Sequence, residues 1–187
     1  GYVNGLAVYG PNMGTLMEIE AIAVRAGRGT GRLLVTGIVE EEEIGSRDGR
    51  TIKRKSMAKA STDNVITAIK KYLGIDPGEY DIHLNFPGGT PVDGPSAGIT
   101  IAVAVYSAIT NSYVDNRIAM TGEVSIRGKV KGVGGIIPKI EAAVRAGVKK
   151  VIIPTENRQE IFSTYDIEVI PVASTHDAVK IATLHPP

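Results

Sequence analysis

The chain has 187 residues, of which 43% are hydrophobic and 22% are charged, and its formal net charge is +1. This length predicts one domain, and the composition is ordinary for a folded protein with a substantial core. A charge so close to zero provides no strong field that would attract nucleic acid or an acidic membrane. The sequence contains no cysteine, which excludes disulfides, thiolate catalysis and cysteine-bound zinc. No apolar run reaches the roughly 18 to 20 residues that a membrane span requires. Because the chain begins with Gly1 rather than Met, we expect a piece of a longer protein without a signal segment.

The first third of the chain reads as strands. Residues 6–9, 15–24 and 33–39 are rich in apolar and β-branched side chains, and 18–22 alternate between polar and apolar. Gly10-Pro11-Asn12 predicts a turn between the first two strands. The basic, glycine-rich stretch 25–32 has two interpretations, a phosphate or nucleic-acid contact and an exposed hairpin tip. We favour the hairpin tip, because no strand-to-helix phosphate motif accompanies it.

Next, an acidic run at Glu40–Glu43 and a basic run at Arg50–Lys55 predict the flanks of a mobile, solvated connection. Helical spacing of apolar residues from 55 to 73, followed by Gly74, predicts a helix and its stop. Residues 80–86 predict a strand, and a loop rich in glycine and proline leads from it to Asp93.

The rest of the chain alternates between the two kinds of element. An apolar helix continues through 99–109, and short strands are expected at 118–120, 124–126 and 129–131. Helices at 137–146, 157–164 and 176–184 alternate with strands at 151–153 and 167–170. This order predicts an α/β or α+β domain built in layers.

Ser96 begins the apolar helix and is a candidate nucleophile. Pro95 suits a first helical position, because the N–H group that it lacks would be unpaired there, and Asp93 and Gly94 before it are able to cap or to turn sharply. Free backbone N–H groups at a helix start favour negative charge, such as the oxyanion of an attacked carbonyl.

The base for this serine is the next question. None of the three histidines, His83, His176 and His185, has a compelling position, although His83 lies in the strand before the active loop and could line the site or be structural. Lys139 shares a helix face with Ile136 and Ala143, whereas Glu141 and Arg145 form an outward i, i+4 pair. Burial of its amine would lower the pKa toward 7 or 8 from about 10.4, so that it could accept the serine proton. The alternative is a lysine that extends from the edge of the stripe into water. No metal-binding spacing is present.

Three motifs together resemble the proteolytic domain of the Lon family. They are Asp93-Gly94-Pro95-Ser96-Ala97-Gly98, Thr121-Gly122-Glu123-Val124, and Gly134-Gly135 with Lys139 four residues beyond, in the same order and spacing. The opening Val-Asn-Gly-Leu-Ala-Val and the later Lys-Lys-Val-Ile-Ile-Pro resemble the archaeal, membrane-associated branch. The similarity therefore covers nearly the whole chain, residues 1–187.

The resemblance implies a serine–lysine endopeptidase with a fold like the second domain of ribosomal protein S5. It makes Ser96 the nucleophile of an acyl-enzyme mechanism and Lys139 the general base, with the lysine amine oriented by the Thr121 hydroxyl. It places Asp93 at the active site, either pairing with Lys139 in a resting arrangement or simply capping the helix. Backbone N–H groups around Pro95 to Ala97 would form the oxyanion hole, with Ser96 and a loop neighbour as donors because Pro95 has none.

Three departures from the family pattern are visible, one of which is a loop from His83 to Ser96 that is one residue shorter than in the bacterial branch. The acidic-glycine pair expected after the strand proline is Gly88-Gly89 here, and Ile136-Ile137-Pro138 replaces the charged residues of bacterial members. These changes affect the expected substrate preference rather than the dyad.

The resemblance also implies partners outside this chain. Lon proteins are hexamers in which an ATP- and Mg²⁺-dependent AAA+ module unfolds proteins and feeds them to the protease. This chain has no GxxxxGK[ST] motif, so we expect no cofactor in it and ATP binding elsewhere in the same polypeptide. The expected substrates are unfolded proteins or peptides. We expect a location on the cytoplasmic side, with any membrane anchor in a segment outside this chain.

Two other classes of function are open to the sequence. A small-molecule kinase with the same S5-like architecture would bind phosphate at Gly94–Gly98, although Pro95 removes a needed N–H donor and no second substrate domain follows. A non-catalytic module would serve as an assembly ring or bind nucleic acid through the basic stretches at 25–32 and 50–55.

Overall fold

A seven-stranded mixed sheet organises the protein in the computed structural model, which describes residues 1–38, 41–45, 51–88 and 94–184. The strand order is β12-β11-β8-β1-β2-β6-β3. Strands β1 and β2 form a long antiparallel hairpin in register from Tyr2↔Glu20 to Tyr9↔Met13, whereas β8, β11 and β12 run parallel to one another. The mixed α/β architecture is the predicted fold class. The bounds are β1 Tyr2–Tyr9, β2 Met13–Arg25, β3 Leu33–Thr36, β6 Tyr80–Asn85, β8 Ile118–Met120, β11 Lys150–Pro154 and β12 Glu168–Val172.

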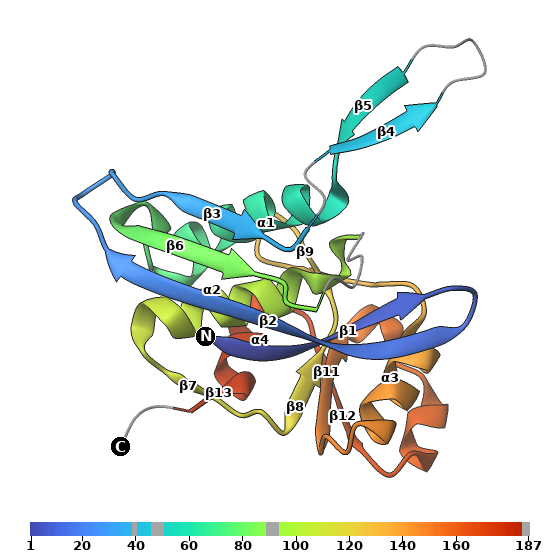
Figure 1. Cartoon of the computed structure of the whole chain (residues 1–187). Helices are drawn as coiled ribbons and strands as arrows, with labels where there is room; N and C mark the ends of the chain where they lie inside the picture. The colour runs from blue at the N-terminus through green and yellow to red at the C-terminus, as the bar shows by residue number, and fades with distance from the viewer. Residues whose placement is uncertain (39–40, 46–50, 89–93, 185–187) are drawn as a thin grey trace.

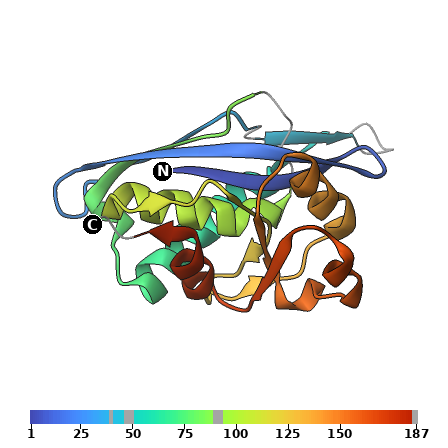
Figure 2. The same cartoon turned by 90° about the horizontal axis from the view of Figure 1, so that it is seen from below.

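Helices pack on both faces of this sheet, while the outer face of β2, β6 and β3 keeps exposed side chains such as Ile22 and Leu34. On one face lie α1 (Met57–Ala68), α2 (Gly98–Thr110) and α4 (Thr175–Ala182), and on the other lies α3 (Ile136–Arg145). In Figure 2, β2 crosses the top of the molecule with α2 and the dark-red α4 beneath it. The strands supply both cores by alternation, since Ile152 of β11 packs in the α2 core whereas Val151 and Ile153 pack in the α3 core.

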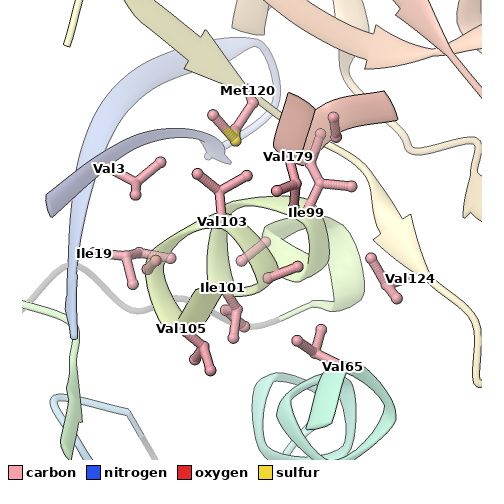
Figure 3. Packing of buried hydrophobic residues seen from close by; sticks show 14 of the residues in the cluster. Val3, Ile19, Val65, Ile99, Ile101, Val103, Val105, Met120, Val124 and Val179 are labelled. Carbon is pink, nitrogen blue, oxygen red and sulfur yellow. The ribbon is translucent and has the colours of Figure 1, made fainter. Parts of the chain in front are cut away.

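Helix α2 is apolar on all sides because other elements surround it. Figure 3 shows its side chains pointing in several directions, toward Val3 and Ile19 of the sheet and toward Val65 of α1 and Val179 of α4. Ile99 and Ile101 are fully buried, and each such side chain contributes about 1.5 to 3 kcal/mol on removal from water. The start of α2, next to Ser96, is therefore fixed by fully buried core packing.

The basic stretch at 25–32 is not a hairpin tip. Strand β6 lies between β2 and β3, pairing antiparallel with β2 and parallel with β3, so that the stretch crosses over β6 instead of turning back on β2. Its backbone is tied to the 3₁₀ turn at Pro77–Glu79, where Ala26 N–H donates to Glu79 and Gly31 N–H to Gly78. The expected strand 33–39 is described as a strand only to Thr36.

The acidic and basic runs are strands, and the mobile connection predicted between them includes residues 46–49, which lie outside the described part of the chain. They form a two-stranded antiparallel hairpin, β4 (Glu41–Gly45) and β5 (Thr51–Lys55), which projects from the body of the molecule in Figure 1. The register sets Glu41 opposite Lys55 and Glu43 opposite Lys53.

Several predicted elements are confirmed with small changes of boundary. Ser56 caps α1, a π-helical turn at Ile69–Leu73 extends it, and Gly74 ends it in the left-handed conformation with φ 70°. The expected helix at 157–164 is instead two 3₁₀ turns, Thr155–Asn157 and Glu160–Thr164, because the chain is extended at Arg158 and Gln159. The last helix ends at Ala182, and β13 (Thr183–Leu184) pairs with β7 (Tyr113–Val114). The remaining short strands are β9 (Glu123–Val124) and β10 (Val130–Lys131).

Candidate active site

Ser96 and Lys139 line the same cavity, which has a volume of about 370 Å³. Ser96 is half-buried in a 3₁₀ turn, Pro95–Ala97, that leads directly into α2, and Lys139 lies on α3 from the opposite face of the sheet. The serine turn and the lysine meet at Thr121, the residue that directly follows β8. The lining residues are Ala7, Val8, Met17, Met57, Gly94, Pro95, Ser96, Glu123, Gly132, Val133, Gly134 and Lys139.

The turn that carries Ser96 is fixed by hydrogen bonds to its carbonyl groups. Ser96 C=O accepts from Gly122 N–H at 2.8 Å and from the Thr121 hydroxyl at 3.3 Å, and Pro95 C=O accepts from the Ser61 hydroxyl at 3.3 Å. Before the turn, Gly94 has φ 141° and ψ 159°, a region open essentially to glycine alone. The predicted sharp turn at Gly94 is thus confirmed, and Ala97 is buried behind the serine.

Lys139 is buried, with 3% of its surface exposed, as its position on the apolar stripe predicted. It shares this face of α3 with Ile136 and Ile140, and removal from water lowers the pKa of its amine from 10.5 to about 8. The helix comes close to the sheet because Gly14 of β2 has no side chain, since a β-carbon there would lie 1.9 Å from Pro138 O. A side-chain amine in this setting is partly neutral near pH 8.

Thr121 connects the lysine to the serine turn. The Lys139 amine donates to Thr121 Oγ1 at 3.1 Å, and the same hydroxyl donates to Ser96 C=O. Thr121 is fully buried, and its own N–H donates to Ile152 of β11. The geometry is the one that the resemblance predicted for this threonine, and it holds the amine and the serine backbone to one strand end.

The Ser96 hydroxyl and the Lys139 amine are not hydrogen-bonded to each other in the described part of the chain. Direct proton transfer requires an approach to about 3 Å. The two groups therefore share a cavity without a direct hydrogen bond between them. Asp93, which the resemblance placed beside Lys139 or at the helix cap, lies outside the described residues.

The structure does not bring His83 to this cavity. In β6 the neighbours Ile82 and Leu84 point into the core, so that His83 points out from the other face of the sheet. There its Nε2 lies 3.0 Å from Thr36 Oγ1, in a separate hollow that Ile22 and Leu34 help to form.

Within α3, which is described throughout, the predicted pair of Glu141 and Arg145 does not form. Arg145 donates to the Gly14 carbonyl at 3.1 Å, and Glu141 accepts from the Tyr165 hydroxyl at 3.4 Å. The neighbouring strand and turn therefore provide partners that the helix sequence alone could not reveal.

Most of the apolar lining was not foreseen. Ala7 and Val8 come from β1, and Met17 and Met57 from β2 and the start of α1. Glu123 belongs to the Thr-Gly-Glu segment, which was the one signal in the sequence that this carboxylate lies at the site. Within the ranges that the structure describes, no group of three or more His, Asp or Glu side chains could hold a metal ion.

Comparison with known proteins identifies the family of the chain. A model of the Lon protease (S16) C-terminal proteolytic domain matches residues 1–184. The chain is 53% identical over its whole length to "Lon protease 2" of Bacillus subtilis, of which it covers 34%. It is 41% identical to the archaeal Lon proteases of Thermococcus kodakarensis and Pyrococcus abyssi, with 97% of the chain matching 27% and 17% of those proteins. The chain thus spans about a third or less of these relatives. On these matches, the chain belongs to the Lon protease (S16) family and corresponds to its C-terminal proteolytic domain.

Proposed function

We propose that this chain is the serine endopeptidase part of a longer ATP-dependent protease, with Ser96 as nucleophile and Lys139 as general base. The observation that carries the proposal is the buried lysine amine, with a pKa of about 8, held by Thr121 in the cavity that Ser96 lines. An ordinary lysine is charged at neutral pH and cannot accept a proton, whereas this one can.

The reaction divides into two steps. Rotation of the side chains within the shared cavity brings the hydroxyl to the amine, which takes the proton as Ser96 Oγ attacks the scissile carbonyl. The resulting ammonium then protonates the leaving amine, and the acyl group stays on the serine until water releases it. Thr121 stabilises the ammonium by accepting its hydrogen bond and orients the neutral amine when the proton has left. Backbone N–H groups of the serine turn would stabilise the oxyanion.

The proposal is tested by covalent labelling and peptide cleavage. We expect a fluorophosphonate probe to label Ser96 and a fluorogenic peptide to be cleaved slowly, and Ser96→Ala to abolish both without changing the thermal melt. Ser163→Ala, which removes an exposed hydroxyl, is the matched control. Labelling that persists in Ser96→Ala, or that does not depend on Lys139, would refute the dyad.

The two alternative functions find less support. A phosphate site at the start of α2 would lack the N–H of Pro95, and family membership gives no reason to expect a kinase. The basic stretch at 25–32 is hydrogen-bonded to the turn at Pro77–Glu79, at the end of the sheet. It lies far from the catalytic motifs in the sequence. Tight ATP binding by the chain, or salt-sensitive DNA binding without labelling, would favour these alternatives.

We further propose that the complete protein adds an AAA+ module that uses ATP and Mg²⁺, assembles as a hexamer and degrades unfolded proteins. None of the helices described is both long and apolar enough to cross a membrane. A location on the cytoplasmic side, with an anchor in another segment, is part of this proposal. Size measurement and membrane fractionation of the complete protein would test these points.

A further inference from the structure

The segment from Gly132 to Gly134 forms part of the lining of the catalytic cavity. It connects β10 to α3, and Lys139 lies only five residues beyond its end. Glycine at two of its three positions makes the backbone itself the surface that a bound peptide would meet. A segment of this kind needs support from outside, because its own side chains provide little.

Two neighbouring side chains provide that support. Asn157 accepts from Val133 N–H at 2.8 Å and donates to Val133 C=O at 2.9 Å, so that its amide pairs with the backbone of one residue on both sides. Glu156 accepts from Gly132 N–H at 2.8 Å and from the Lys131 amine at 3.2 Å. We call this pair of side chains the Glu156–Asn157 clasp.

The clasp is attached to the rigid centre of the fold. Its two residues form the end of the 3₁₀ turn that follows β11 directly, and residues 151–154 of that strand are fully or almost fully buried. The fit is close, because a β-carbon at Gly132 would lie 3.0 Å from Glu156 Oε2 and 3.5 Å from Asn157 Oδ1. The Gly132 N–H and the Lys131 amine lower the pKa of the Glu156 carboxyl, so it stays ionised wherever the Lys139 amine is able to act.

We propose that the Glu156–Asn157 clasp holds residues 132–134 in the shape that binds an extended peptide beside Ser96. This inference rests on the proposed peptidase function and names Glu156 and Asn157 as positioning residues, since neither lines the cavity. A peptide bound against backbone is recognised by its own main chain, so the clasp serves binding that depends little on the substrate side chain.

Loss of the clasp affects peptide binding more than proton transfer. Lys139 is held by the packing of Ile136 and Ile140 and by Thr121, all independent of Asn157. The pH at which activity is half-maximal should therefore not move when Asn157 is truncated. A small acylating reagent, which does not extend along the segment, should also react at an unchanged rate.

The test compares Asn157→Ala with Gln159→Ala in the full chain. Gln159 is an exposed amide two residues away, which makes it a matched truncation outside the catalytic cavity. We expect Asn157→Ala to raise KM for a fluorogenic peptide by about 5- to 30-fold, the effect of one to two hydrogen bonds. We expect kcat, its pH midpoint and the rate of fluorophosphonate labelling to stay unchanged, and Gln159→Ala to resemble the unaltered chain.

Hydrogen exchange provides a second measurement that does not need activity. We expect the amide of Val133 to exchange faster in Asn157→Ala, and that of Gly132 to do so in Glu156→Gln, which keeps an oxygen but loses the charge. The Glu156→Gln variant also keeps the test valid if Asn157→Ala does not fold. Unchanged KM in a labelled, folded variant would overturn the inference alone, as would a shifted pH midpoint. Absence of labelling in the unaltered chain would overturn the peptidase proposal and this inference with it.

Discussion

Replacing Lys139 by methionine should make the protein more stable while removing its activity. Burial removes water from the charged amine and destabilises it in the folded state, so its pKa falls from 10.5 to about 8. At 1.36 kcal/mol per pKa unit, this shift corresponds to about 3 kcal/mol at pH 7. Methionine has a similar length and no charge, so it fills the same space beside Ile136 and Ile140.

The hydrogen bond to Thr121 reduces this gain. Its loss costs about 1 kcal/mol, although the Thr121 hydroxyl keeps its bond to Ser96 C=O. The net expectation is a stabilisation of about 2 kcal/mol at pH 7, which for a domain of this size raises Tm by about 4 to 8 °C.

The pH dependence of stability shows whether burial of the Lys139 amine causes this difference. Between the folded pKa of about 8 and the unfolded value of 10.5, the unfolded chain binds more protons, so the stability of the unaltered protein rises with pH there. The advantage of Lys139→Met is therefore complete below pH 8 and shrinks above it, by about 1 kcal/mol at pH 9. Thermal or urea unfolding at pH 7 and pH 9 measures both values.

Lys149→Met is the matched control, because this lysine is exposed and a substitution there should change stability by no more than about 0.5 kcal/mol. A lower Tm in Lys139→Met, or an advantage that does not change with pH, would refute the argument that an uncompensated amine is buried here. The first result would point to a structural partner of the ammonium in the segment next to Ser96.

Three further predictions concern activity. Because the base must be neutral, the rate of peptide cleavage by the unaltered chain should fall as the pH decreases below about 8, by about 50-fold at pH 6. A flat pH–rate profile would contradict the role of Lys139 as base. Lys139→Arg should be folded but inactive in peptide cleavage at any pH below 10, since a guanidinium does not release its proton, and measurable turnover would end the dyad proposal. Thr121→Val keeps the shape of the side chain but removes the hydroxyl, and it should lower kcat by up to about 100-fold. The pH midpoint of activity should move downward, because the ammonium of Lys139 loses its hydrogen-bond acceptor. The serine turn keeps its bond from Gly122 N–H. Unchanged kcat in that variant would show that the threonine only fills space.

The chemistry of the site was largely predictable because it depends on local patterns. A serine after Gly94 and Pro95 and a lysine on an apolar helix stripe are both visible in single segments of sequence. Burial of Lys139 follows from its i−3 and i+4 neighbours, since a helix that packs on a sheet must bury that stripe. The role of Gly74 as a helix stop is local in the same way.

Pairings between distant segments could not be predicted in this manner. The position of β6 between β2 and β3 depends on contacts across more than 45 residues, and nothing in the local pattern of 25–32 distinguishes a hairpin tip from a crossover. For the same reason, Glu141 and Arg145 looked like an ion pair on the helix, although each bonds to a different part of the chain. The outward direction of His83 followed only once the face of β6 that meets α2 was known.

Burial of the lysine lowers stability and supplies basicity through a single physical cause. Removal of the amine from water by α3 and the sheet destabilises the charged form, and this same free energy makes the neutral form available to Ser96 at pH 8. The fold offsets the cost elsewhere, in the fully buried aliphatic side chains of α2 that hold the serine turn from the other face. The site lies where both cores meet, at the end of β8, where the Thr121 hydroxyl bonds both the lysine amine and the serine backbone.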